Sequence, residues 1–180
     1  VLLVENPAIP ALAINATLLT GARHEPEEKA GLAIMASNLL DEGTKTRSSF
    51  DIAEAIEATG GHLETDASFE RTVAAATVLK QDADLGLDLV ADLLINPTFP
   101  EDYVAKEKSR TLAEIPNAKD RPQVVAGWAF NELVYGSHPL HRPSQGYPDT
   151  IERITRDDLL GFHDHFFAPN NALLSIVGDF

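Results

Sequence analysis

Cysteine is absent from this chain, and tryptophan and methionine occur only once each. Without cysteine there are no disulfides and no thiolate metal sites, and the chain fits a reducing or an oxidising compartment equally well. No stretch approaches the ~18 apolar residues that a membrane-spanning helix needs, and the first residues show no signal-peptide pattern. We therefore expect a soluble chain without a membrane span, in the cytoplasm or the periplasm.

Basic residues are scarce. Only 14 Lys and Arg stand against 28 Asp and Glu, which gives a formal charge of −14 at pH 7. Nucleic acids are bound mainly through Lys and Arg, so we expect no nucleic-acid partner. An acidic surface attracts basic peptides, although such a surface more often serves only solubility.

What is present is a pattern of strands and helices. Strands are predicted at 1–5, 11–20, 61–67, 70–80 and 172–177. Helices are predicted at 27–41, 48–60, 82–95, 100–135 and 155–167. The strand at 70–80 alternates so little that we expect both of its faces to be buried. Pro116 is expected to interrupt the fourth helical region, which restarts after Pro122. Adjacent strand pairs with helices between them favour an α+β fold, and without a linker residues 1–180 form one domain.

Two sets of side chains are weak candidates for a metal site. Carboxylates four residues apart on one helical face are usually just solvated, and such a row is formed by Asp84, Asp88 and Asp92. Of the six histidines, His163 and His165 project to different sides of a helix. His138 and His141 flank a proline in a loop, and His24 and His62 are isolated. We expect neither set to hold a metal ion.

Residues 31–44, which read GLAIMASNLLDEGT, carry the most functional information. They resemble the helix with the HxxEH zinc motif of the insulinase/pitrilysin family of inverted zincins, where two His ligands and a catalytic Glu share one helical face. The corresponding positions here hold Ile34, Ser37 and Asn38. Ile has no lone pair, Asn is a poor zinc ligand, and a Ser hydroxyl cannot replace a carboxylate base. The resemblance therefore implies a domain whose catalytic motif has been erased.

Further fragments similar to the same family follow in order along the chain. They include Gly43-Thr44 with Arg47-Ser48, Gly60-Gly61, Asn96-Pro97 with Phe99-Pro100, Arg142-Pro143 with Gly146, and Pro169-Asn170-Asn171-Ala172. Each is weak alone, but their order and spacing identify the chain as similar to an N-terminal domain of this family. The resemblance implies the α/β roll of processing-peptidase-like metallopeptidases, an α+β fold.

The resemblance also marks two acids and one strand. Family members take a third zinc ligand from a Glu on a later helix, with a second Glu seven residues before it; Glu114 and Glu107 stand at these places. After the double glycine, the family has Asn-Ala in a strand at the edge of its cleft. Glu64 and Thr65 stand there, so we expect a peptide-binding edge without the Asn that steadies a substrate.

By resemblance, residues 1–180 form one domain of a longer, two-domain subunit. In heterodimeric members one subunit carries zinc and the other has lost it, and this chain is similar to the second. The expected role is a non-catalytic subunit that helps to bind and process peptides in a cavity shared with a zinc-bearing homologous subunit. We expect no cofactor in this chain and no activity without that partner.

Two other interpretations stay open. The domain could be a structural scaffold, like the core proteins of respiratory complexes, or an active zinc metalloendopeptidase with a non-standard metal site. An Arg/Tyr pair in the C-terminal half of the subunit would favour the peptidase partner over the scaffold. Elemental analysis of the purified domain would identify a metal enzyme.

Overall fold

Five strands form one mixed sheet in the computed structural model, which describes residues 1–180 apart from the side chain of Lys119. The strands are β1 (Leu2–Glu5), β2 (Ala11–Leu18), β3 (His62–Ala67), β4 (Thr72–Leu79) and β5 (Ala172–Gly178). Their order is β1-β5-β2-β4-β3. The β1–β5 pair is parallel and the other pairs are antiparallel. The predicted α+β class is confirmed, and β3 lies at one edge of the sheet.

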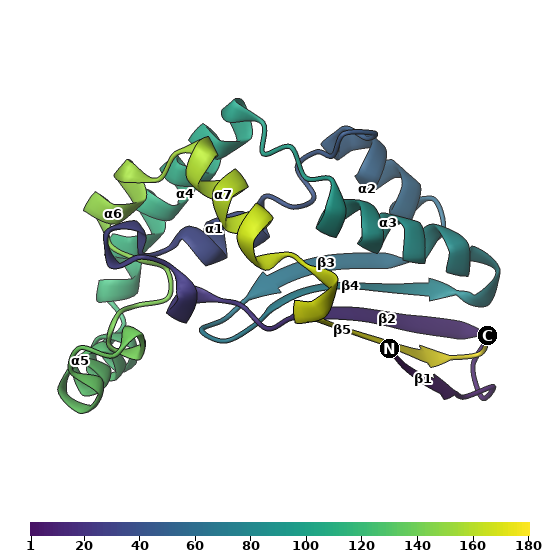
Figure 1. Cartoon of the computed structure of the whole chain (residues 1–180), viewed down its shortest axis with the longest axis horizontal. Helices are drawn as coiled ribbons and strands as arrows, with labels where there is room; N and C mark the ends of the chain where they lie inside the picture. Colours follow the sequence, from purple (N-terminus) through teal and green to yellow (C-terminus); the bar gives the residue numbers. More distant parts are fainter.

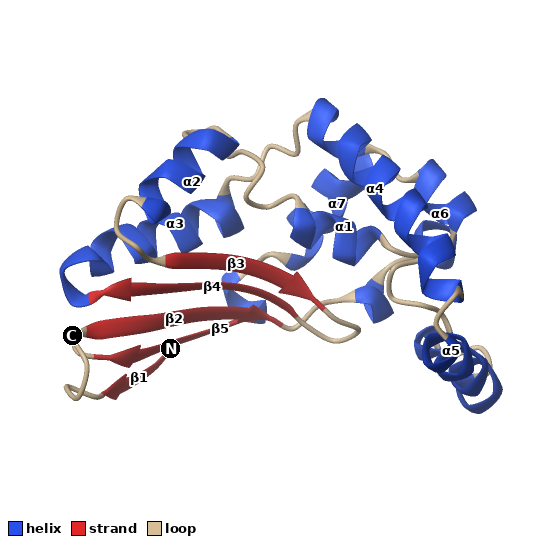
Figure 2. Cartoon of the chain, turned by 180° about the vertical axis from the view of Figure 1, so that it is seen from behind, coloured by secondary structure: helices blue, strands red, loops and turns tan.

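The helices form a layer on one face of the sheet and a cluster beyond its end. They are α1 (Leu32–Asn38), α2 (Ser49–Glu57), α3 (Ala83–Ile95), α4 (Glu101–Lys119), α5 (Pro122–Tyr135), α6 (Pro148–Arg153) and α7 (Arg156–Phe166). Figure 1 shows α2 and α3 over the sheet, and α1, α4, α6 and α7 gathered beyond one end, with α5 projecting from the body. The view from behind shows the same two groups (Figure 2).

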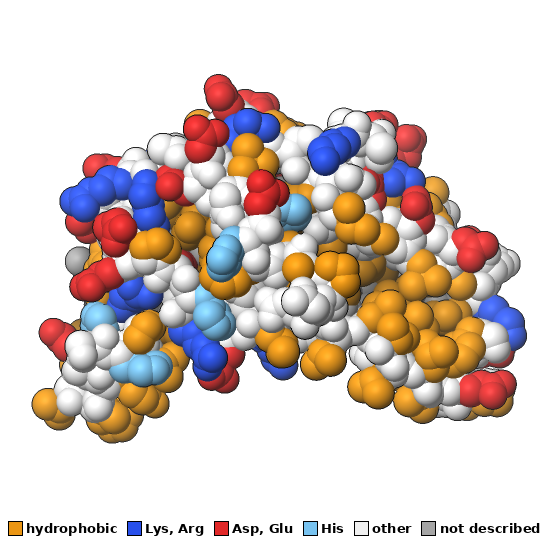
Figure 3. Space-filling view, in the orientation of Figure 1, with side chains coloured by type: hydrophobic (Ala, Val, Ile, Leu, Met, Phe, Trp, Pro, Cys, Tyr) orange, Lys and Arg blue, Asp and Glu red, His pale blue; other side chains and the backbone are white. Residues whose placement is uncertain are grey.

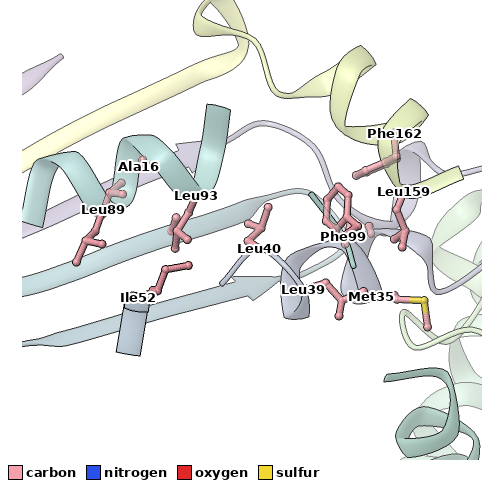
Figure 4. Packing of buried hydrophobic residues seen from close by; sticks show 14 of the residues in the cluster. Ala16, Met35, Leu39, Leu40, Ile52, Leu89, Leu93, Phe99, Leu159 and Phe162 are labelled. Atoms are coloured by element: carbon pink, nitrogen blue, oxygen red, sulfur yellow. The ribbon is translucent and has the colours of Figure 1, made fainter. Parts of the chain in front are cut away.

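The core lies between the sheet and the helices. Buried side chains converge from α2 (Ile52), α3 (Leu89 and Leu93) and α7 (Leu159 and Phe162), as Figure 4 shows. Burial of such aliphatic and aromatic groups is the main driving force for folding, at roughly 1.5–3 kcal/mol for each fully buried side chain. One core therefore joins the sheet layer to the helical cluster that contains α1.

Strand β4 differs from its prediction. Ala74, Ala76 and Val78 are buried, whereas Thr77 and Leu79 are exposed. The strand thus alternates and is not buried on both faces. The reason is that the helices cover only one face of the sheet, so the run of small residues on β4 does not mark a double-sided core.

Helix α1 is shorter than the predicted helix at 27–41. Residues Glu27–Lys29 form a 3-10 turn, and Gly31 has φ of +100°, a left-handed conformation that breaks the helical path before Leu32. The buried carboxylate of Glu25 accepts hydrogen bonds from the N–H groups of Gly31 and Ala33, at 2.8 and 2.9 Å. Glu25 thus caps α1 from a distance, a contact that the sequence pattern did not reveal.

The predicted break in the helical region exists, but it lies at 120–121 and not at Pro116: α4 runs through Pro116 to Lys119, and α5 begins at Pro122, where a restart was predicted. Pro116 is exposed, where water can bond the carbonyl group of Leu112 in place of the missing N–H. Helix α6 was not predicted. Pro148 occupies its first turn, a favoured place for proline, but six residues are too few to show a helical period.

Hydrophobic side chains gather on the side of the molecule that carries β1 and β5 (Figure 3). An apolar groove of about 370 Å³ lies there between α3 and the strands β2 and β5. Strand β1 leaves Leu2, Leu3 and Val4 exposed. Within the part of the chain that the structure describes, α5 contributes no buried residue, and none of the helices combines the length and apolarity needed to cross a membrane.

Candidate functional site

The three erased motif positions lie on α1 in different surroundings. Ile34 is partly buried. Ser37 is fully buried, and its Oγ has no hydrogen-bond partner among the described residues. Asn38 is partly buried, and its Nδ2 donates a hydrogen bond of 2.8 Å to Oε1 of Glu107. The position of the family's second histidine is therefore tied to an acid of α4.

Glu107 is buried and held by a neighbour on its own helix. Arg110 donates from Nε to Oε2 at 2.8 Å and from Nη2 to Oε1 at 2.7 Å, a fork-like pairing. The side chain of Glu114 is 62% exposed, and its Oε1 lies 3.8 Å from Nη1 of Arg110. Of the two acids that the sequence singled out, the structure thus brings Glu107, and not Glu114, against Asn38.

A polar pocket of about 400 Å³ opens beside this cluster. Its walls include Asn38 from α1, Glu107 and Arg110 from α4, and Glu64 and Thr65 from β3. Three elements distant in sequence therefore meet here because α1 packs between β3 and α4. Glu64 and Thr65 lie next to the erased motif.

The pocket carries charges of both signs. Asp41 and Glu42, just beyond α1, face it together with Lys106 and Arg110. Burial raises the pKa of Asp41 above its ordinary value, and the neighbouring Glu42 adds to this effect. The hydrogen bonds to Glu107 raise the pKa of Arg110, so its positive charge is permanent.

The outer side of β3 is available for another strand. In the described structure β3 pairs only with β4, in antiparallel register, and His62, Glu64 and Asp66 are exposed along it. An edge strand presents unpaired N–H and C=O groups that an extended peptide can bond. The polar pocket lies beside this edge, at Glu64 and Thr65.

These side chains do not fit a catalytic zinc ion. Ile34 offers no donor atom, the Ser37 hydroxyl is enclosed, and the amide nitrogen of Asn38 faces Glu107. Zinc in metallopeptidases is held by imidazole and carboxylate ligands, whereas the carboxylate of Glu107 is already paired through both oxygens with the guanidinium of Arg110. Over the residues that the structure describes, no three His, Cys, Asp or Glu side chains are grouped as a metal site.

The predicted acidic row on α3 does not form one solvated face. Asp92 is buried and accepts hydrogen bonds from Thr44, Thr46 and Arg47, and from the side-chain amide of Asn96. Burial alone would raise the pKa of Asp92, but these hydrogen bonds together lower it. The cluster fixes the loop after α1 to α3. In the sequence, the cluster is marked only by Gly43-Thr44 and Arg47-Ser48. The spacing of these residues does not show that they contact α3.

The two histidines on α7 lie in different surroundings, as predicted. His163 is buried, with Nε2 2.9 Å from the carbonyl oxygen of Leu94, and His165 is exposed. This geometry gives His163 a packing and hydrogen-bonding role next to Phe99.

Known proteins resemble this chain in sequence. The family model described as insulinase (peptidase family M16) matches residues 1–146. A Rickettsia felis protein described as an uncharacterized zinc protease is 32% identical over 99% of this chain and 43% of its own length. The Bacillus subtilis zinc protease YmxG, also described as uncharacterized, is 30% identical over 99% of this chain and 44% of its own length. The chain thus spans less than half the length of these relatives.

Solved structures show the same fold. A crystal structure of an inactive M16 peptidase domain from Pseudomonas fluorescens has a TM-score of 0.94 and 27% identity, and covers 99% of this chain and 43% of that one. Pitrilysin has a TM-score of 0.86 at 21% identity, over 99% of this chain and 20% of its own. The predicted inverted-zincin domain fold is confirmed. The chain belongs to the insulinase family, peptidase family M16.

Proposed function

We propose that this chain is a non-catalytic domain of an M16 subunit, which binds peptides and acts together with a zinc-bearing homologous subunit. The observation that carries this proposal is the hydrogen bond from Asn38 to Glu107, which occupies the place of a metal ligand with an amide. Zinc and its activated water would then belong to the partner.

Peptide binding is supported by the edge strand and its pocket. Strand β3 offers backbone groups for an added strand, and the pocket next to Glu64 and Thr65 is polar and open. Asp41, Glu42 and Glu64 make basic side chains the favoured occupants. This attraction should weaken as salt screens the charges.

A homologous partner domain is supported by length. Relatives with matching domains are more than twice as long as this chain, and the Pseudomonas fluorescens chain is matched over only 43% of its length. In the proposed assembly, this chain closes the cavity around a peptide and excludes water, while the partner performs the cleavage.

The test is a mixing experiment. The turnover of a basic peptide by a zinc-bearing homologue from the same source is measured with and without the full-length protein, and complex formation is followed by light scattering. We expect no turnover by this protein alone, and stimulation when the two are mixed. A partner that binds this protein but is not stimulated by it would contradict the proposed role.

Two matched variants locate the peptide site. Glu64→Lys reverses a charge inside the pocket, whereas Asp66→Lys reverses a charge on the same exposed side of β3 but outside the pocket. We expect Glu64→Lys to reduce the stimulated turnover of a basic peptide by about tenfold, the effect of ~1.4 kcal/mol. Asp66→Lys should change it little. Equal losses would indicate a general charge effect and no local site.

A structural scaffold is the second candidate, and one observation favours it. Helix α5 exposes Phe130, Leu133 and Val134 by 61%, 85% and 54%. Exposed apolar patches of this kind often mark protein–protein contacts. A scaffold would form a stable complex through such surfaces without changing peptide turnover, so the mixing experiment separates the two candidates.

A further inference from the structure

Arg110 lies between the two acids that the family resemblance connects with a metal. Glu107, Arg110 and Glu114 are spaced by three and four residues, so they share one face of α4. Arg110 pairs with Glu107 at 2.7 Å and lies 3.8 Å from the carboxylate of Glu114. One guanidinium therefore bridges both carboxylates.

The cluster continues onto α1 through a shared atom. Oε1 of Glu107 accepts from Nη2 of Arg110 and also from Nδ2 of Asn38, at 2.7 and 2.8 Å. The side chain of Glu107 is only 8% exposed, whereas that of Arg110 is 52% exposed. The buried carboxylate is thus neutralised by a cation that reaches it from the pocket side.

We propose that the guanidinium of Arg110 takes the place of the metal's positive charge and keeps divalent cations out of the erased site. A carboxylate that sits in a buried place needs a positive partner or a set of hydrogen bonds. Arg110 provides both, and its charge is permanent. A dication brought to Glu107 would meet a carboxylate that is already bonded to Arg110, and a fixed positive charge within a few ångströms.

The role of Arg110 rests on the proposed loss of zinc chemistry. It adds a reason why the site would not regain zinc through histidines alone. Erasure by Ile34 and Asn38 alone could be reversed by two histidines. With Arg110 in place, two histidines are not enough, because both oxygens of Glu107 stay bonded to a guanidinium that a metal ion would have to displace. Position 37 supplies no metal ligand in the motif, so Ser37 can be left unchanged in a test of binding.

The experiment compares zinc affinities of two variants of the full-length protein. One carries Ile34→His and Asn38→His, and the other carries the same changes with Arg110→Gln. Zinc ion alone is the probe, measured by competition with a chromophoric chelator. We expect the variant with Arg110→Gln to bind zinc about 10–100-fold more tightly, the range in which groups around metal ligands act.

Lys106→Gln in the same two-histidine background is the matched control. Lys106 lines the same pocket, but its ammonium lies over the ring of Tyr103, 5.7 Å from the centroid, and not on Glu107. This change should raise zinc affinity much less than Arg110→Gln does. Equal affinities with and without Arg110, including no measurable binding by either variant, would overturn the proposal.

A second measurement covers the case in which the two-histidine variants do not fold. In the otherwise unchanged protein, Arg110→Gln should lower the urea midpoint, Arg110→Lys should lower it less, and the addition of Glu107→Gln to Arg110→Gln should restore most of the loss. A midpoint for Arg110→Gln equal to that of the parent would overturn the proposal. Neither readout uses peptide turnover, so failure here is distinct from failure of the proposed function.

Discussion

Asn38 and Glu107 are joined by a hydrogen bond of 2.8 Å between an amide nitrogen and a carboxylate oxygen, and this bond connects α1 to α4. Among metal-binding members, the corresponding positions are a histidine ligand and an acid next to the site. Here the same two positions form a direct contact. The erased site is therefore a packed interface between two helices on one wall of an open pocket.

Asn38→Asp should destabilise the protein because it places a second carboxylate against Glu107. We expect a loss of about 1–3 kcal/mol at neutral pH, and a smaller loss in acid, where one carboxyl group becomes protonated. Urea unfolding at neutral and at acidic pH measures the two losses of stability. The control is Asn117→Asp, at an exposed position of α4, the helix that carries Glu107. Similar losses for both variants would contradict the close contact.

Ser37→Ala should stabilise the protein. The hydroxyl of Ser37 is buried without a hydrogen-bond partner in the described structure, so its removal relieves a desolvation cost of about 1 kcal/mol. Ser37→Glu, which restores the family's base, should instead cost about 3 kcal/mol or more. Thermal or urea unfolding of both variants is the measurement, with the exposed Ser109→Ala as control. A stable Ser37→Glu variant would indicate an open site.

Glu25 should make stability depend on pH. Burial raises its pKa to about 7, although hydrogen bonds from Ala33 and Gly31 and the charge of Arg142 oppose the rise. The folded state then binds more protons than the unfolded state between about pH 4.5 and 7, so stability is full below this range and falls as pH rises through it. Glu25→Gln should flatten this slope in urea unfolding, and the exposed Glu28→Gln should not. Parallel slopes for the two variants would contradict the assignment.

Asp92 should contribute far more to the stability of the fold than Asp88 on the same helix. Removal of the Asp92 carboxylate leaves Thr44, Thr46, Arg47 and Asn96 without their acceptor, so Asp92→Ala should cost about 2–4 kcal/mol. The side chain of Asp88 is 60% exposed and pairs only with Arg47, so Asp88→Ala should cost less than about 1 kcal/mol. The denaturant midpoints of the two variants measure this difference in stability.

The strands and most helices could be predicted from the sequence because they depend on the pattern of residues within each segment. The capping serine at Ser48 marks the start of α2. The residues at positions 34, 37 and 38, on which the proposed loss of the motif depends, are read from the sequence alone. The remaining features depend on contacts between distant residues. Nothing local distinguishes Asp92 from Asp88, and only the packing of α1 against α4 shows that Asn38 meets Glu107 and not Glu114. The break was predicted too early because Pro116 lies only three residues before the end of α4, so the helix loses one hydrogen bond near its C-terminus.

The zinc content of the full-length protein tests the proposed loss of metal chemistry most directly. The protein is equilibrated with zinc, dialysed against zinc-free buffer and measured by elemental analysis, beside a Glu107→Gln variant. We expect far less than one zinc ion per chain in both proteins, because the site offers no imidazole and the carboxylate of Glu107 is held by Arg110 and Asn38. About one zinc ion per chain in the parent, lost in Glu107→Gln, would place a working metal site at this pocket and contradict the proposal.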